Sequence, residues 1–301
     1  MAQIVPLSRK LPITSLAILP SSEHVLAGSG TCLLAISCFT KEETAWNVLS
    51  KNRIHVILPQ TGTEFVFLAG GQEVVYGLCD PSKGAFDTLC KRHLHDWVLA
   101  AAYLSSTHII LATASNTVLV LSLPDLVTTQ TIYCDERPFL WSAAFTQKQY
   151  ETLQEVKLAV GTIMQNVLIW SPFVSTSVKR HTGHDGSIFG VAFSPSGKEV
   201  ASVSDDRTLR VWSTSSGEPE VLWGHQDRVW RVIWVDEETI ASAGQDAVVL
   251  LWKRREGTWT VDQRWAGHDR KHVWSLAVHK GKVLSGGADS SIRFWDSRDS
   301  E

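Results

Sequence analysis

The chain contains three copies of a His, a Ser and an Asp, the residue types that form an acyl-transfer triad. In each copy the Ser follows the His by 17 or 18 residues, the Asp follows four residues later, and a Trp follows the Asp by six. The three sets are His184, Ser202, Asp206 and Trp212; His225, Ser242, Asp246 and Trp252; and His268, Ser285, Asp289 and Trp295. A catalytic triad occurs once in an enzyme, so a set that repeats with a Trp each time predicts a structural role.

These sets lie in three sequence repeats, residues 183–213, 224–253 and 267–296, whose Trp residues are 40 and 43 apart. Between the shared positions run short segments of alternating apolar residues, such as IFGVAFS, EVASVS and TLRVWS, bounded by Gly, Pro, Ser and Asp. This pattern predicts four β-strands in each repeat and no long helix.

The Gly-His pair that opens each repeat, the Trp near its end and the period of about 40 residues resemble the WD40 repeat. The resemblance implies a β-propeller in which each set of four side chains is a structural relay inside one blade. It implies little about function, because one fold serves many functions.

The first half of the chain carries weaker copies of the same period. Segments at about 12–51, 53–92, 97–134 and 139–181 each have room for four strands. The last of them has Trp170 at the end of its third strand but Met164 where an Asp is expected, and Leu121 takes the Trp place one segment earlier. With the three strong repeats, they predict an all-β chain folded over residues 1–301 as a single seven-bladed propeller.

One strand remains to be placed. The last repeat ends at Asp296, one strand short, whereas residues 2–8 form an apolar strand outside any repeat. We expect this N-terminal strand to complete the last blade and close the ring, because closure removes both exposed sheet edges.

The composition of the chain limits its surroundings and partners. It has 301 residues and a net charge of −3, so no general attraction to nucleic acid or to anionic membranes follows. No apolar run approaches the ~18 residues needed to span a bilayer. The five cysteines form no CxxC pair and are interpreted as reduced thiols. We expect a cytoplasmic protein without a membrane contact.

Motifs for cofactors and metals are weak. Gly28 and Gly30 lack the third Gly and the following helix of a dinucleotide or S-adenosylmethionine loop, so they predict a turn between strands. His93 and His95 offer two metal ligands, but no further ligand cluster supports them, and solvated or relay histidines are favoured. We therefore expect no cofactor, no metal and no catalytic residue, and interpret the propeller as a rigid, monomeric interaction platform.

Aromatic residues recur at one position of the predicted innermost strands: Trp141, Phe189, Trp230 and Trp274. In WD40 proteins this position lies at the upper rim of the central channel. One interpretation is packing between blades. Binding is favoured over it because Ile188, Val229 and Val273 already occupy the apolar core positions of these strands. Exposed aromatic side chains anchor protein interfaces and stack on bases.

Basic residues are concentrated near the same strands. Residues 253–282 contain eight Lys or Arg against three Asp or Glu, a local excess of +5. We expect Arg228, Arg270, Lys271 and His272 beside the aromatic residues on the upper face, where they are candidates for binding a partner or RNA. Residues 253–255 are expected on the lower face. A solvated run of charge is the alternative interpretation.

Longer stretches resemble a particular WD40 family. HDWVLAAAYL at 95–104, KLAVGTIMQNVLIWSP at 157–172 and GHQDRVWRVIW at 224–234 are similar to the N-terminal propeller of the WD-repeat regulators of tRNA ribose methylation. The resemblance implies a non-catalytic partner of an FtsJ-like methyltransferase that methylates the 2′-oxygen of the tRNA wobble nucleotide, with tRNA bound through the complex.

Members of the regulator family run longer, with further propellers, so the sequence leaves open whether the chain is a fragment.

Two other classes of function remain open. A generic WD40 adaptor for a ubiquitin ligase, trafficking or signalling complex would use the same upper face. A catalytic propeller would need a polar cluster in the central channel, which the sequence does not display.

Overall fold

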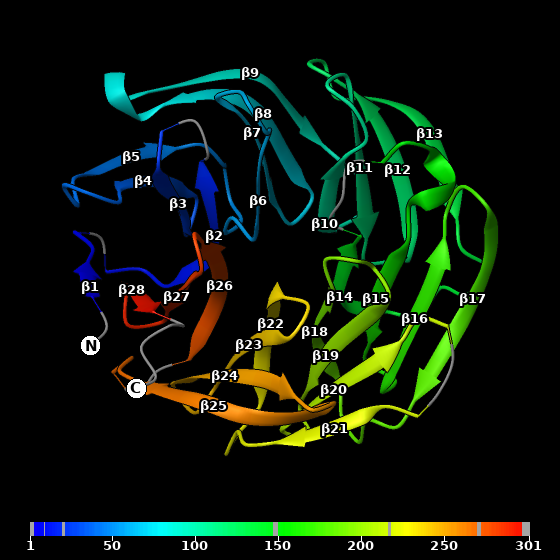
Figure 1. The fold of residues 1–301 in the computed structure, drawn as a ribbon. Helices are drawn as coiled ribbons and strands as arrows, with labels where there is room; N and C mark the ends of the chain where they lie inside the picture. Colours follow the sequence, from blue (N-terminus) through cyan, green and yellow to red (C-terminus); the bar gives the residue numbers. More distant parts are fainter. Residues whose placement is uncertain are drawn as a thin grey trace.

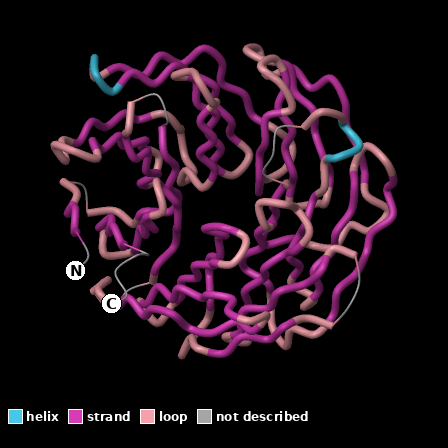
Figure 2. The backbone as a smooth tube through the Cα atoms, viewed as in Figure 1, coloured by secondary structure: helices cyan, strands magenta, loops and turns pink. Residues whose placement is uncertain are grey.

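The computed structural model describes residues 3–8, 10–19, 22–146, 150–215, 218–269 and 272–296. Within these ranges the chain forms seven four-stranded antiparallel sheets and two short 3-10 helices, η1 (Pro81–Lys83) and η2 (Leu153–Glu155). Figures 1 and 2 show the seven sheets arranged as blades around a central axis. The predicted all-β, seven-bladed propeller is confirmed. Neither helix is long and apolar enough to cross a bilayer.

The blades are numbered in chain order, and the strands of each are given from the axis outward. Blade one contains β2 (Ile13–Leu19), β3 (His24–Ser29), β4 (Cys32–Ser37) and β5 (Glu43–Asn47). Blade two contains β6 (Val56–Pro59), β7 (Phe65–Gly70), β8 (Glu73–Asp80) and β9 (Ala85–His93). Blade three contains β10 (Val98–Tyr103), β11 (His108–Thr113), β12 (Thr117–Ser122) and β13 (Val127–Tyr133). Blade four contains β14 (Leu140–Phe145), β15 (Leu158–Thr162), β16 (Asn166–Ser171) and β17 (Ser175–Thr182).

The last three blades hold the strong repeats. Blade five contains β18 (Ile188–Phe193), β19 (Glu199–Ser204), β20 (Thr208–Ser213) and β21 (Glu220–Trp223). Blade six contains β22 (Val229–Asp236), β23 (Thr239–Gly244), β24 (Val248–Arg255) and β25 (Thr258–Ala266). Blade seven contains β26 (Val273–His279), β27 (Lys282–Gly287), β28 (Ser291–Asp296) and, as its outermost strand, β1 (Gln3–Pro6).

The second strands of the blades form the core. β3, β7, β11 and β19 are each buried from their second residue to their last. Successive side chains point to opposite faces of a strand, so these apolar runs pack against both neighbouring blades. The innermost strands are less buried, and β10 is only half-buried after Val98. Solvent therefore reaches the innermost strands along the axis, and we call this space the central channel.

The ring closes as predicted from the sequence. β1 pairs antiparallel with β28 in a register that places Gln3 opposite Phe294 and Pro6 opposite Ser291. Beyond the strand, the Ser8 backbone N–H and hydroxyl donate to the Glu43 carboxylate at 3.0 and 2.9 Å. The N-terminal segment thus covers the edge of blade seven and is tied to the outer strand of blade one.

The first four blades can be compared with the segments suggested by the sequence. Their strands run over 13–47, 56–93, 98–133 and 140–182, where the sequence suggested about 12–51, 53–92, 97–134 and 139–181.

Polar contacts of another kind hold these weaker blades. In blade two the buried Glu73 carboxylate accepts from the Ser50 backbone N–H at 2.7 Å and from the Ser50 hydroxyl at 2.8 Å. It also forms an ion pair with Lys91 at 2.9 Å.

Candidate functional site

The His, Ser, Asp and Trp set of blade five forms a linear hydrogen-bonded relay. The Trp212 indole N–H donates to the Ser202 hydroxyl at 2.7 Å. The Ser202 hydroxyl lies 2.7 Å from His184 Nε2, and His184 Nδ1 lies 2.7 Å from the Asp206 carboxylate. Because a carboxylate only accepts, Nδ1 carries the proton and Nε2 accepts from the serine.

Blades six and seven repeat this arrangement with almost identical distances. His225 lies 2.9 Å from Asp246 and 2.7 Å from Ser242, to which Trp252 donates at 2.8 Å. In blade seven, His268 lies 2.9 Å from Asp289 and 2.8 Å from Ser285, to which Trp295 donates at 2.7 Å. The serines Ser202, Ser242 and Ser285 are all fully buried. Each buried hydroxyl thus has two partners within its blade, which is the arrangement that a structural relay requires.

Blade four provides a natural control for the relay. Trp170 occupies the position of the relay Trp. Val160 stands ten residues earlier, at the position of the relay serine, and the buried Trp170 indole N–H has no hydrogen-bond partner.

We expect Trp252→Phe to lower the free energy of unfolding by roughly 1–3 kcal/mol, because a buried hydroxyl loses its donor. Trp170→Phe should cost much less. Equal urea midpoints for wild type, Trp252→Phe and Asp246→Ala would contradict the relay.

The charges of the relay predict how stability depends on pH. Burial lowers the pKa of His184, and the hydrogen bond to Asp206 offsets this only in part. Burial alone would raise the pKa of Asp206, but hydrogen bonds from His184 and Thr208 hold it below its usual range. Burial also lowers the pKa of His55. The folded protein therefore holds these imidazoles neutral.

Stability should accordingly decrease on mild acidification. The unfolded chain binds protons at these histidines below about pH 6.5, whereas the folded chain does so only at lower pH, so stability is present above that pH and is lost below it. We expect the urea midpoint to fall between about pH 7.5 and pH 5.5, and His184→Asn to reduce that slope. A midpoint that rises on acidification would exclude this assignment.

The aromatic residues singled out in the sequence occupy β-bulges. We call the face on which the innermost strands begin the upper face. Near that end, each of β14, β18, β22 and β26 has a register shift that leaves one residue unpaired, and these residues are Trp141, Phe189, Trp230 and Trp274. A bulge redirects the side chain of its extra residue. The buried residues before them, including Ile188, Val229 and Val273, fill the core as expected.

These four side chains, which we call the aromatic rim, touch one another across four blades. Ring centroids lie 6.1 Å apart for Trp141 and Phe189, 4.5 Å for Phe189 and Trp230, and 5.0 Å for Trp230 and Trp274. Trp141 is 51% exposed, and the other three are half-buried. The rim therefore combines packing between blades with an apolar surface that water can reach.

The polar candidates beside the rim differ in their surroundings. Arg228 forms an ion pair with Asp205 of the neighbouring blade at 2.5 Å. His272 packs on Trp230 at 6.0 Å with the rings nearly parallel, and on Trp274 at 5.1 Å. Arg270 and Lys271 lie outside the described residues.

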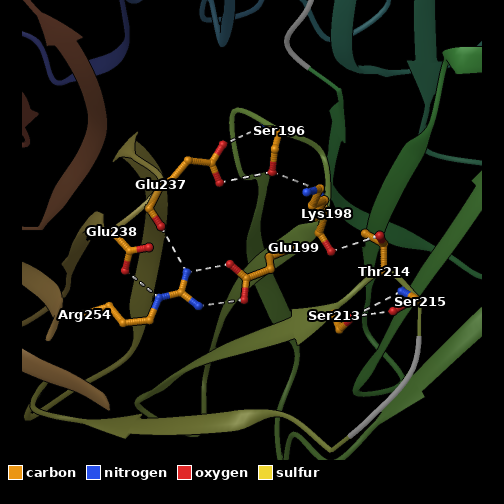
Figure 3. Close-up of a pocket in the computed structure, with 9 residues that line it drawn as sticks. All are labelled: Ser196, Lys198, Glu199, Ser213, Thr214, Ser215, Glu237, Glu238 and Arg254. Carbon is orange, nitrogen blue, oxygen red and sulfur yellow. Dashed lines mark hydrogen bonds and ion pairs between the residues drawn. The ribbon is translucent and has the colours of Figure 1, made fainter. Parts of the chain in front are cut away.

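The basic residues 253–255 end the third strand of blade six, on the opposite, lower face. In a shallow pocket between blades five and six, the Arg254 guanidinium donates to both oxygens of Glu199 at 3.0 and 2.6 Å and to Glu238 at 2.9 Å (Figure 3). Lys253 and Arg255 both pair with Asp262, at 3.1 and 2.6 Å. These three charges are balanced by carboxylates and do not contribute to the rim.

Sequence reasoning missed further residues of the upper face. Phe139 and Trp97 are 57% and 52% exposed, and Phe139 contacts Trp141 at 5.8 Å. Each directly precedes the first buried residue of an innermost strand, a position that the repeat register defines. Arg53, which lies over the Trp274 ring at 5.9 Å, comes from the loop before blade two, and no repeat signal marks it.

Comparisons with known proteins agree with the repeats. The family model for the WD domain, G-beta repeat (WD40), matches residues 175–213 and 259–296. Both matches begin in the outermost strand of the preceding blade, so the sequence repeat is offset from the blade by one strand. The repeat between them, with its complete relay in blade six, is not part of the match.

The chain is similar to curated proteins that are named as regulators of a tRNA methyltransferase. The tRNA (34-2'-O)-methyltransferase regulator WDR6 of Bos taurus is 30% identical over 220 residues, which cover 67% of this chain and 19% of that protein. The Homo sapiens protein of the same name is 29% identical over the same shares. Protein tipD of Dictyostelium discoideum is 27% identical over 147 residues, 48% of this chain and 24% of that protein. The match spans about one fifth of the length of the WDR6 relatives. The chain is therefore a seven-bladed β-propeller that contains WD40 repeats at residues 175–213 and 259–296 and resembles part of the tRNA (34-2'-O)-methyltransferase regulators.

Proposed function

We propose that the chain is a non-catalytic scaffold that binds an FtsJ-like methyltransferase in the cytoplasm and supports 2′-O-methylation of the tRNA wobble nucleotide. The similarity to the WDR6 regulators over 67% of the chain carries this proposal. Because the match covers 19% of those proteins, the activity of a whole regulator is assigned to this propeller only as part of the proposal.

The aromatic rim is the proposed contact surface for the enzyme. Aromatic side chains that are partly exposed supply large contact areas at a small entropic cost, and they dominate the energy of many interfaces. Trp141 meets this description with half of its surface exposed beside Phe189. In this proposal tRNA is bound through the complex.

Reconstitution tests the proposal. A purified FtsJ-like methyltransferase, the purified chain, or both are incubated with S-adenosylmethionine and unmodified tRNA, and methylation at nucleotide 34 is measured. We expect no transfer by the chain alone and faster or redirected transfer when both are present. Methyl transfer by the chain alone would contradict the scaffold. Association with other proteins and no effect on methylation would favour the generic adaptor.

A further inference from the structure

One residue of the central channel departs from the pattern of the other blades. In five other blades the residue after the bulge of the innermost strand is small: Ser15, Ala100, Ser142, Gly190 and Ser275. Ser15 and Ser142 donate to backbone carbonyls of the next blade, at 3.0 and 3.3 Å. Blade six has Arg231 at this position. Its long side chain is too large for the space that these serines occupy.

The Arg231 side chain lies in the central channel. It starts from the innermost strand β22 and is exposed to solvent. Its charge opposes protonation of His55, which precedes the innermost strand of blade two, on the other side of the axis. The surrounding protein also lowers the pKa of the Arg231 guanidinium. An arginine nevertheless stays charged in proteins.

This charge has no counterion within the described ranges. None of the described carboxylates forms an ion pair or a hydrogen bond with Arg231 or with Arg53. His55 offers no negative charge, because an imidazole is either neutral or positive. Its Nδ1 accepts from the Gly71 N–H at 3.4 Å, and its Nε2 contacts the Val98 carbonyl. The Trp230 indole N–H is likewise buried without an acceptor. Near the rim, the described residues thus present two guanidinium groups without a carboxylate partner and one indole N–H without an acceptor.

We propose that the central channel beneath the aromatic rim binds the carboxylate of an Asp or Glu side chain that a protein partner inserts between Arg231 and Arg53. A guanidinium recognises a carboxylate through paired hydrogen bonds, and the pair strengthens where water is scarce. The flanking residues of the partner would pack on the rim. The inference rests on the proposed function only in placing a protein partner on the rim.

The position of Arg231 favours a protein side chain over RNA. A polynucleotide presents its phosphates along a continuous backbone and binds stripes of basic residues on a surface. Arg231 is instead a single basic residue on an innermost strand, next to Trp230 of the rim, and the group that its charge affects is His55 of the blade-two segment. The nearest run of basic residues, 253–255, is paired with carboxylates on the lower face.

A selection experiment tests the channel without a known partner. A phage-displayed library of random linear peptides is captured on the immobilised chain, in the wild type, Arg231→Gln, Arg231→Lys and Arg264→Gln. Arg264 is an exposed arginine on the outermost strand of the same blade and serves as the control. We expect wild type and Arg264→Gln to select peptides with an Asp or Glu beside an apolar residue. Arg231→Gln should lose the preference for the acid, and Arg231→Lys should keep part of it.

Binding of one selected peptide gives the quantitative result. Changing its acid to the amide should weaken binding to wild type at least tenfold, whereas Arg231→Gln should bind both forms alike. Thermal denaturation of each variant verifies that it is folded. Should Arg231→Gln not fold, Arg53→Gln is used in its place, with the same expectation.

Several results would overturn the inference. They are selection of no peptide, selected peptides without acids, an acid preference that survives Arg231→Gln, and Arg231-dependent capture of a single-stranded RNA pool in place of peptides. Failure of the proposed function is seen separately, in the methylation assay. A chain that leaves methylation unchanged but selects acidic peptides through Arg231 would refute the methyltransferase partner and retain the channel site.

Discussion

Deletion of residues 2–8 is expected to destabilise the propeller more than any single substitution discussed here. β1 is the only cover of the β28 edge among the described strands, and without it blade seven has three strands and an open ladder. At about 1 kcal/mol for each net hydrogen bond, loss of the ladder and of the Ser8 contacts to Glu43 should cost several kcal/mol. The exposed edge should also promote association between chains.

Urea denaturation and size-exclusion chromatography with light scattering measure both effects. A synthetic peptide of residues 1–10, added in trans, should restore part of the lost stability. Ile4→Thr serves as the control, because the Ile4 side chain is 52% exposed and threonine is also compatible with a strand. A truncated protein that is monomeric and as stable as wild type would refute closure by β1.

Trp230→Ala is expected to weaken partner binding by roughly 2 kcal/mol or more, about thirtyfold, mainly through faster dissociation. Trp230 contacts the rings of Phe189 and Trp274, so it holds the centre of the aromatic rim. Trp141→Ala should weaken binding as well and change stability by only about 0.5 kcal/mol, because Trp141 is half exposed.

Trp223 supplies the matched control for these variants. It is 68% exposed on the outermost strand of blade five, away from the channel, so Trp223→Ala should affect neither binding nor stability appreciably. Binding to the methyltransferase is measured by surface plasmon resonance and unfolding by denaturant titration. If Trp230→Ala unfolds the chain while its folded fraction binds normally, the rim belongs to the core.

The fold was predictable where the sequence repeats strictly. Blades five to seven are marked by buried polar relays, whose geometry requires fixed residue types at fixed distances along the chain. The earlier blades lack this relay, and apolar residues fill most of their cores. Many apolar sequences meet that requirement, so only the period and the strand count indicate these blades.

The site was predictable only in part, for a physical reason. Trp141 and its equivalents occupy one register position, which the repeat reveals. Contacts between blades leave no such pattern: Arg228 meets Asp205 of the previous blade, and Arg53 reaches Trp274 from a distant loop. Arg231 stands where five other blades have a small residue, but the sequence does not show which charged groups lie near it across the ring.

The pairing of β1 with β28 also constrains how the protein is made. Ile4 leaves the ribosome long before its partner Arg293, because almost the whole propeller separates the two residues along the chain. At 5–20 residues per second the strand waits roughly 15 to 60 s for its partner, and it then closes a very long loop. During that interval the nascent protein holds an unpaired strand at one end and an incomplete blade at the other. Chaperones that shield β-strand edges should therefore engage this chain during synthesis, and release it when the last blade emerges.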